Sequence, residues 1–141
     1  YWEELVEQER KLGERFIYDS SCLSVIASFA PRGFNEIQFI FKEGTSVTEL
    51  SQRQISEFAT CLIKALRGYK ELGIGSFNLV TYSGPTGEKL RHYRLNAKLI
   101  SRPYPQGIYT NDTGPMERLC DVWVVDTLPE MVAENMRSFF P

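Results

Sequence analysis

The sequence predicts an α+β fold in which a mostly antiparallel sheet packs against one long helix, with a further helix at each end. Three observations support this prediction. Two short apolar runs flank Ser20-Ser21 near the start of the chain, as in a pair of strands. An apolar stripe at helical spacing runs from about residue 46 to residue 72, and a segment that alternates with a period of two follows it.

The first helix is expected in the first dozen residues, where Trp2, Leu5 and Val6 lie at helical spacing and Gly13 ends the pattern. Its acidic residues are interpreted as a solvated face, and they are Glu3, Glu4, Glu7, Glu9 and Glu14. Three strands should follow, with a turn at Pro31-Arg32-Gly33 before the last, and their expected ranges are Arg15–Asp19, Leu23–Phe29 and Glu36–Lys42.

The long helix is expected to begin at a capping box formed by Ser46 and Glu49 and to end near Leu72, before Gly73 and Gly75. One face of this helix is apolar, at intervals of three and four residues: Ile55, Phe58, Ala59, Leu62, Leu66 and Tyr69. This face predicts that the helix packs on the sheet.

Further strands are expected after the long helix, at Ser76–Tyr82, His92–Arg102 and Leu119–Val125. A last helix should open with Thr127, Pro129 and Glu130. Its buried side is predicted to carry Val132, Met136 and Phe140.

Length and charge exclude several classes of protein. A chain of 141 residues with 43% hydrophobic and 24% charged residues suits a single globular domain spanning residues 1–141. The formal net charge is −2, so no overall basic field favours nucleic acid or an anionic membrane as a partner. No apolar run reaches the roughly 18 to 20 residues of a membrane span and no signal segment opens the chain, so a cytoplasmic location is expected.

Cysteine, metal and cofactor chemistry is not expected. Cys22, Cys61 and Cys120 are widely spaced and the chain has one histidine, which argues against a disulfide framework and a zinc site. The thiols are expected to be reduced and buried. The sequence also lacks a nucleophile elbow, a phosphate loop and a His/Glu pair at metal spacing, so no catalytic residue, metal ligand or cofactor is assigned.

The segment 92–103 is the most informative part of the chain, because its polar and apolar residues alternate. A strand sends successive side chains to opposite faces, so one set should enter the core, namely Tyr93, Leu95, Ala97 and Leu99. The other set should share the opposite face as a polar row, namely His92, Arg94, Asn96 and Lys98. The residues alone leave three interpretations of this polar row open: a solvated surface, an anion site, and a contact with another domain or subunit.

Several segments, in their order along the chain, resemble the histidine-triad (HIT) superfamily. They are Gly13-Glu14-Arg15, Phe34-Asn35-Glu36, Phe77-Asn78-Leu79-Val80 and Ile100-Ser101-Arg102-Pro103. The closing Thr127-Leu128-Pro129-Glu130 is similar to the C-terminal half of galactose-1-phosphate uridylyltransferases. The resemblance spans nearly the whole chain and implies a HIT-like fold and a position as the C-terminal part of a longer protein.

The resemblance also shows where the chemistry of the family should lie. In HIT proteins the strand that corresponds to Arg94–Arg102 carries His-x-His-x-His or, in C-terminal halves, His-x-His-x-Glu before a Pro-Arg, and alignment on Arg102 puts Arg94, Asn96 and Lys98 at those positions. The family attacks a phosphorus atom with a neutral imidazole. An amide has no such nucleophilic lone pair, and lysine and arginine are almost fully protonated at pH 7. The covalent mechanism of the family is therefore not expected, and His92 is interpreted as an ordinary, partly exposed histidine.

Binding is a separate expectation, because in the superfamily this face lies beneath the phosphates of the ligand. The resemblance implies phosphate contacts from His92, Arg94, Asn96, Lys98 and Arg102. It implies a base and sugar pocket at Phe29, Phe34 and Asn78, with Pro31 and Ile37 as further apolar wall. The open alternatives are that the aromatic residues belong to the core and that Asn78 caps the end of a strand.

The expected function is that of a C-terminal HIT-like domain of a galactose-1-phosphate uridylyltransferase-like protein that lacks the catalytic histidine. It would serve in binding a sugar nucleotide or in assembly with an N-terminal HIT-like domain of the same protein, and the dimers of the family suggest a homodimer. One alternative is a stand-alone module that holds a nucleotide or sugar phosphate through Arg94, Lys98 and Arg102 without turnover. Another is an active transferase or hydrolase that uses water and the cations for electrostatic stabilisation.

Overall fold

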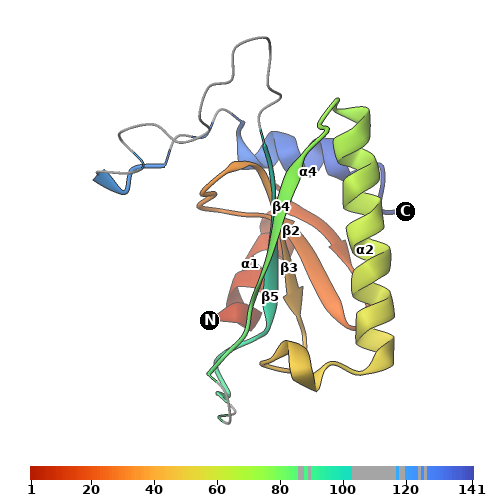
Figure 1. The fold of residues 1–141 in the computed structure, drawn as a ribbon, viewed down its shortest axis with the longest axis vertical. Coiled ribbons are helices and arrows are strands. Elements are labelled where there is room, and N and C mark those ends of the chain that lie inside the picture. The colour runs from red at the N-terminus through yellow and green to blue at the C-terminus, as the bar shows by residue number, and fades with distance from the viewer. Residues whose placement is uncertain (86–87, 89, 103–116, 118–119, 124, 126) are drawn as a thin grey trace.

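A five-stranded sheet organises the chain (Figure 1). The computed structural model describes residues 1–85, 88, 90–102, 117, 120–123, 125 and 127–141. The strands are β1 Phe16–Asp19, β2 Leu23–Ala27, β3 Phe34–Phe41, β4 Phe77–Tyr82 and β5 Asn96–Ser101, in the spatial order β1-β2-β3-β5-β4. Each neighbouring pair is antiparallel, which confirms the predicted α+β class and its antiparallel sheet.

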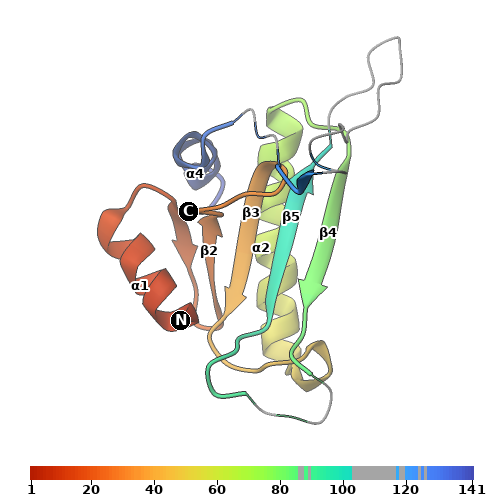
Figure 2. The ribbon, with the colours of Figure 1, turned by 90° about the vertical axis from the view of Figure 1, so that its left-hand side faces the viewer.

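Helices cover both faces of this sheet. Figure 2 shows α1, Trp2–Leu12, in front of one face and α2, Gln52–Glu71, behind the other. The last helix, α4, spans Pro129–Arg137 and packs on the same side as α2. A short 3₁₀ helix, Val47–Glu49, precedes α2. None of the helices in the described ranges is long and apolar enough to cross a membrane.

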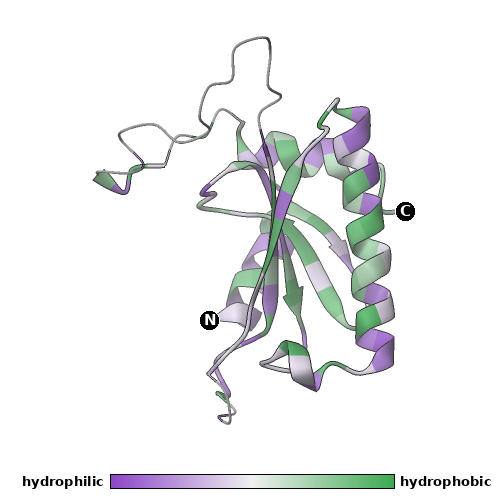
Figure 3. Cartoon of the chain, viewed as in Figure 1, coloured by the Kyte–Doolittle hydropathy of each residue, from purple (hydrophilic) through white to green (hydrophobic). Residues whose placement is uncertain are grey.

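The central strands are therefore buried on two sides. The larger core lies between the sheet and α2 with α4, and its largest fully buried side chains include Tyr69, Phe39 and Phe41. A smaller cluster of Val6, Ile26 and Ile40 lies beneath α1. All five residues of β2 are buried, and the colouring of Figure 3 shows the central strands as largely hydrophobic.

The start of α2 differs from the prediction. Ser46 caps only the 3₁₀ helix, where its side chain accepts a hydrogen bond from the backbone N–H of Thr48. The capping box of α2 is formed by Ser51 and Gln54 instead. Ser51 lies directly before the uninterrupted helical stretch, so its hydroxyl can satisfy the free N–H groups of the first turn.

The alternating segment is also shorter than predicted, because β5 begins at Asn96 and His92 lies in a turn before it. Leu95, Ala97 and Leu99 are fully buried, as the alternation predicts. Tyr93 does not enter the core. Its ring contacts Trp2 of α1 edge-on at 6.1 Å, and its hydroxyl donates to the carbonyl oxygen of Tyr82 at 3.0 Å.

The C-terminal predictions are corrected in part. Within the predicted strand Leu119–Val125, the described residues are not in a strand, and Cys120, Val122 and Trp123 are exposed. Thr127 is not the N-cap of α4, because Leu128 takes that position. Val132, Met136 and Phe140 are buried, as predicted.

The three cysteines are in different environments, so the prediction of buried thiols holds for one of them. Cys61 is buried, Cys22 is half-buried and Cys120 is exposed. Burial raises the pKa of the Cys61 thiol to about 11. Cys61 is therefore an unreactive core thiol.

The first helix also carries a buried charge that the prediction of a solvated face missed. The side chain of Glu9 is 3% exposed and accepts a hydrogen bond from Nε of Arg15 at 3.0 Å. Arg15 also donates to Glu130 of α4 at 2.7 Å. Burial opposes the charge of Arg15, but its hydrogen bonds with Glu130 and Glu9 outweigh this effect and raise its pKa, while the bond to Arg15 lowers the pKa of Glu130. These contacts join α1 to α4.

A carboxylate of α2 holds the turn between β1 and β2. Glu57 accepts hydrogen bonds from the hydroxyls of Ser21 and Ser20, at 2.6 and 2.7 Å, and from the backbone N–H of Cys22 at 3.1 Å. Nε of Arg53 adds a fourth at 3.3 Å. These bonds favour the charged carboxylate and lower its pKa to about 2, with the bond from Ser21 contributing most.

The pKa of Glu57 predicts a dependence of stability on pH. The folded pKa is below the ordinary value of 4.5, so the stability that the carboxylate contributes is complete above about pH 5 and is lost as the pH falls toward 2. We expect Glu57→Gln to lower the free energy of unfolding by roughly 1–2 kcal/mol at pH 7 and by less at pH 3. Urea unfolding at both pH values, with Glu71→Gln as the control for loss of one charge from the same helix, measures this. An equal loss at the two pH values would contradict it.

Candidate functional site

The candidate site begins on the face of the sheet opposite α2, where β3 and β5 bring four polar side chains together. Alternation along β5 places Asn96 and Lys98 on this face, and alternation along β3 places Glu36 and Gln38 beside them. Gln38 is directly opposite Lys98 in the register. Near Asn35, whose φ is 52°, β3 contains one extra residue relative to β5, so the register shifts at this end of the pair.

Lys98 is already paired within the chain. Its Nζ lies 2.6 Å from Oε1 of Glu36, and the Glu36 side chain is 1% exposed while that of Lys98 is 25% exposed. The second carboxylate oxygen of Glu36 accepts the backbone N–H of Arg32 at 2.7 Å. The counter-ion expected for this cation is therefore a buried glutamate of the neighbouring strand.

Asn96 precedes Lys98 in the polar row and is 2% exposed, so the solvated interpretation is wrong for this residue. Its Oδ1 accepts a hydrogen bond from Nε2 of Gln38 at 3.3 Å. Its Nδ2 donates to the backbone carbonyl of Arg94 at 3.2 Å and to the hydroxyl of Tyr93 at 3.4 Å. The amide is thus held on both sides and functions as a structural link between β3 and β5.

Arg94 leaves the polar row and turns toward α1. Its guanidinium donates to the carbonyl oxygens of Arg91 and Tyr93, both at 2.9 Å, and to the carboxylate of Glu3. The three residues that the resemblance aligns with the triad therefore lie in two different places. Asn96 and Lys98 share a network with β3, and Arg94 belongs to a different surface.

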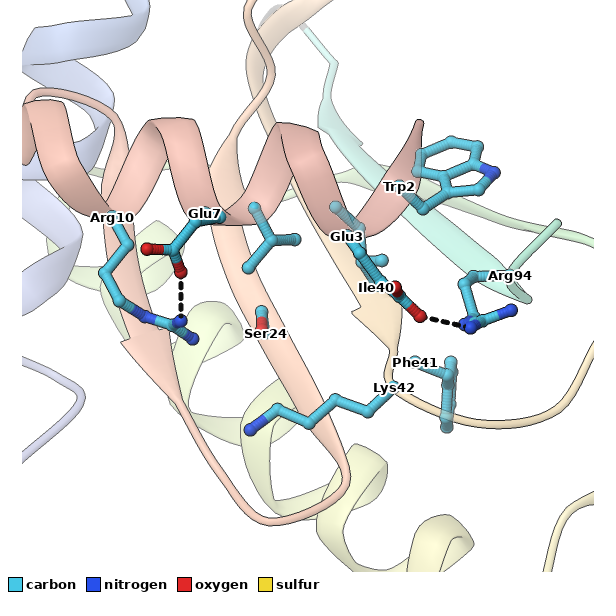
Figure 4. A pocket seen from close by; sticks show the side chains of 10 residues that line it. Trp2, Glu3, Glu7, Arg10, Ser24, Ile40, Phe41, Lys42 and Arg94 are labelled. Atoms are coloured by element: carbon cyan, nitrogen blue, oxygen red, sulfur yellow. Dashed lines mark hydrogen bonds and ion pairs between the residues drawn. The ribbon is translucent and has the colours of Figure 1, made fainter. Parts of the chain in front are cut away.

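That surface is a cavity of about 390 Å³ between α1 and the strands β2 and β3 (Figure 4). Its apolar wall includes Trp2, Val6 and Ile40. Its cationic residues are Arg10, Lys42 and Arg94, which come from three separate parts of the chain. In Figure 4 these three side chains lie around the space beneath α1, with Glu3 and Glu7 beside two of them.

Two further residues were expected to contact phosphate, His92 and Arg102. His92 is exposed in the turn before β5. Arg102 follows β5 and is half-buried, and its backbone N–H donates to the carbonyl of Ser76 at 2.9 Å. Neither residue is a partner of Lys98 or Asn96 in the hydrogen bonds described above.

The residues expected to form a base and sugar pocket are only partly brought together. Phe34 and Asn78 lie on opposite sides of β5, opposite Ser101 and Ile100. Asn78 is exposed and Phe34 is half-buried. Phe29 is 67% exposed and contacts the guanidinium of Arg15, whose Cζ lies 5.0 Å from the ring centroid. Ile37 is fully buried in the core on the α2 side, so it cannot be an exposed pocket wall.

Several residues of the site were not identified from the sequence: Glu3, Arg10, Glu36, Gln38 and Lys42. A signal was present for two of them, because Glu36 and Gln38 alternate with buried apolar residues on β3. Such alternation marks the same face that the polar row of β5 occupies. In the described part of the chain, no group of three histidine, cysteine, aspartate or glutamate side chains is arranged to hold a metal ion.

The architecture is that of the HIT-like fold. It is similar to a uridylyltransferase with a TM-score of 0.79 and 19% identity, over 96% of this chain and 43% of that one. It is similar to an ADP-glucose phosphorylase of Arabidopsis thaliana with a TM-score of 0.76 and 20% identity, over 96% of this chain and 46% of the other. A zinc-bound histidine triad protein of Mycobacterium smegmatis matches with a TM-score of 0.60 and 13% identity, over 88% of this chain and 81% of the other.

The chain is also similar in sequence to a protein of unknown function. The chain is 29% identical over 141 residues to an uncharacterized protein of Archaeoglobus fulgidus, and this match covers 99% of the chain and 41% of the relative. No protein-family model matches the chain. The chain thus spans less than half the length of this relative, of the uridylyltransferase and of the phosphorylase.

The buried pair of Glu36 and Lys98 predicts a strongly non-additive response to mutation. Lys98→Met leaves a carboxylate buried without its counter-ion, and we expect a loss of roughly 2–3 kcal/mol in the free energy of unfolding. Glu36→Gln combined with Lys98→Met should recover most of this loss, because no charge then stays buried. Urea unfolding of the two single variants and the double variant measures the coupling.

Lys42→Met is the matched control, because Lys42 directly follows β3 and pairs with the more exposed Asp19. We expect this variant to lose less than about 1 kcal/mol. A double variant no more stable than Lys98→Met would contradict the buried pairing.

Proposed function

We propose that this chain is a non-catalytic HIT-like domain that corresponds to the C-terminal half of a galactose-1-phosphate uridylyltransferase-like protein and supports an N-terminal HIT-like domain by packing against it. The observation that carries this proposal is that two side chains of the polar row are already bound within the chain. Within this row the amide of Asn96 is buried, and the cation Lys98 is bound to the buried carboxylate of Glu36.

The chemistry of the polar row supports a role other than nucleotidyl transfer. Attack on phosphorus needs an unprotonated nitrogen or oxygen that is free to approach the ligand. Asn96 has no such atom, and its amide is held by Gln38 and Tyr93. Lys98 would have to leave the Glu36 carboxylate before it could bind a phosphate, which does not favour the stand-alone module that uses this row.

The edge of the sheet supports an assembly role. In the described part of the chain, β4 has a strand partner only on its β5 side. Its apolar side chains are unusually open, with Phe77, Val80 and Tyr82 exposed by 44%, 48% and 46%. An edge strand presents unpaired N–H and C=O groups, and an exposed apolar edge is a site for pairing with another strand. The proposed occupant of this edge is the N-terminal domain of the same protein, in agreement with the share of its relatives that the chain covers.

The absence of nucleotidyl transfer is tested directly on this domain. After incubation with UDP-glucose or ADP-glucose, we expect its intact mass to be unchanged, because no residue of the polar row forms a covalent nucleotidyl intermediate. Mass spectrometry of the protein, with a histidine-containing HIT transferase as the positive control, makes this measurement. An adduct that is lost in His92→Ala would overturn the proposal.

The assembly role is tested with this domain and the proposed N-terminal domain, produced as two separate chains. Val80→Lys places a charge on the exposed edge, where it should hinder strand pairing. We expect it to weaken association between the two halves, co-expressed as separate chains, by roughly tenfold or more, while the melting temperature of this domain alone changes little. Leu12→Lys, at an exposed position of α1 that is 53% accessible, is the matched control. Equal association of the two variants would argue against β4 as the interface.

A further inference from the structure

The two edges of the sheet differ in how far they are covered by the rest of the chain. In the described part of the chain, β1 and β4 are the outer strands, so each has a strand partner on one side only. Figure 2 shows β4 at one margin of the sheet and α4 near the opposite margin. The outer side of an edge strand carries N–H and C=O groups that a strand of another molecule can bind. What lies beside each edge therefore decides where another molecule can pair.

The outer edge of β1 is bound by Arg137 of α4. The carbonyl of Arg15 accepts the backbone N–H of Ala27 in β2. Successive carbonyls of a strand point to opposite sides, so the carbonyl of Phe16 points away from β2. Nε of Arg137 donates to this carbonyl at 2.9 Å. An acceptor that an incoming strand would need is therefore already used.

The same guanidinium also binds the turn that leads into β1. Its Nη2 donates to the backbone carbonyl of Glu14 at 2.7 Å and to that of Gly13. Gly13 is the C-cap of α1, and carbonyls at a helix end lack partners within the helix. A guanidinium has five N–H donors in a fixed planar fork, so one side chain can serve three carbonyls at once. Arg137 thus joins the end of α1 and the start of β1 to α4.

The docking of α4 holds Arg137 in this position. Val132, Ala133 and Met136 of α4 are buried in the larger core. At Met136 the helix lies so close to α2 that a Cβ atom on Gly68 would be 2.5 Å from the methionine sulfur. Arg137 is the next residue and the last one of α4. Its backbone is therefore held by packing that does not depend on the edge of β1.

The edge strand β4 is open by comparison. Of its six residues only Leu79 is not exposed, whereas in β1 only Asp19 is exposed. A molecule with two open edges can bind copies of itself without limit, because the edge of one copy pairs with the other edge of the next. A molecule with one closed edge cannot form such a chain.

We propose that Arg137 is an edge guard, which means that its bonds to β1 keep this edge from pairing with the β4 edge of a second copy of the chain. The structure favours β4 as the occupant, because it is a strand of six residues with exposed apolar side chains. The inference rests on the proposed function in one respect, since both treat β4 as an open edge. It goes beyond that function by assigning the closure of β1 to one side chain.

The test compares Arg137→Met with the unmodified chain by sedimentation velocity over a range of protein concentrations. Methionine is a good helix former but donates no hydrogen bond, so it should leave α4 helical and free the carbonyl of Phe16. We expect the affinity of self-association to rise by roughly tenfold or more, with an average mass that increases with concentration beyond that of a dimer. Addition of Val80→Lys to the same chain should reverse this gain, because it places a charge on the β4 edge.

Arg10→Met is the matched control, because Arg10 also lies beside β1. Its Cζ is 5.3 Å from the centroid of the Phe16 ring. Its guanidinium donates to the side chains of Glu7 and Asp19, whereas that of Arg137 donates to backbone carbonyls. The two substitutions are thus the same chemical change beside the same residue of β1. Arg10→Met should associate as the unmodified chain does.

Equal self-association of Arg137→Met and Arg10→Met would overturn the role of Arg137. Self-association of Arg137→Met that persists with Val80→Lys would overturn β4 as the occupant of the β1 edge. Circular dichroism at low protein concentration verifies the fold. If Arg137→Met is unfolded, Arg137→Lys, which keeps the charge but loses the planar fork, is judged by the same two criteria. The assembly role is decided by association of the two halves and the edge guard by the mass of this chain alone, so each can fail separately.

Discussion

Burial of the central strands on both faces is the constraint on which the rest of this structure depends. One face of β2, β3 and β5 packs against α2 and α4, and the opposite face is also largely removed from water. A polar group in such a place must find its partner within the protein, because an unpaired buried charge or amide is strongly destabilising. Glu36, Gln38, Asn96 and Lys98 meet this requirement by bonding to one another across β3 and β5. The same network that lets the sheet be buried also uses the groups that would otherwise face a ligand.

Because of this constraint, the chain can have the HIT-like fold while its polar side chains are already paired within the protein. The HIT-like architecture is present over nearly the whole chain. The positions that align with the triad hold an amide and two cations, each with partners of its own. A side chain that is neutralised by a buried glutamate stabilises the sheet, whereas a catalytic group must be free to change its protonation or its bonding. The resemblance therefore extends to the scaffold, and the function must be argued from the surfaces that this scaffold exposes.

Much of the fold could be predicted because periodicity is a local property. The apolar stripe of α2 and the alternation around Leu95, Ala97 and Leu99 each define a buried face without knowledge of distant residues. The errors have equally local causes. Two serines five residues apart, Ser46 and Ser51, are each followed three residues later by a Glu or Gln, which is the signature of a capping box, and Ser51 is the one that opens α2. Tyr93 continues the alternation of β5 but lies before the strand begins, so its ring is free to turn toward α1.

The site was predicted less well, because a polar residue within a strand is read as exposed. Asn96 was placed on the correct strand but is buried, and Glu9 was assigned to a solvated helix face but is paired with Arg15. Burial of a polar group depends on a partner that the local pattern does not contain. For Glu36 and Gln38 the alternation of β3 was a usable signal, since it places them on the face of the polar row.

The sequence by itself determined the α+β class and the buried faces of α2 and of β5. Only the tertiary structure decided which charges meet. Lys98 and its partner Glu36 are 62 residues apart in the chain, and Arg94 and Glu3 are 91 apart. Spacing of three or four residues places side chains on one helix face, and spacing of two places them on one strand face, but neither states which elements lie side by side. Strand register and the docking of α1 supply that information, and with it the distinction between a closed polar network and an open cavity.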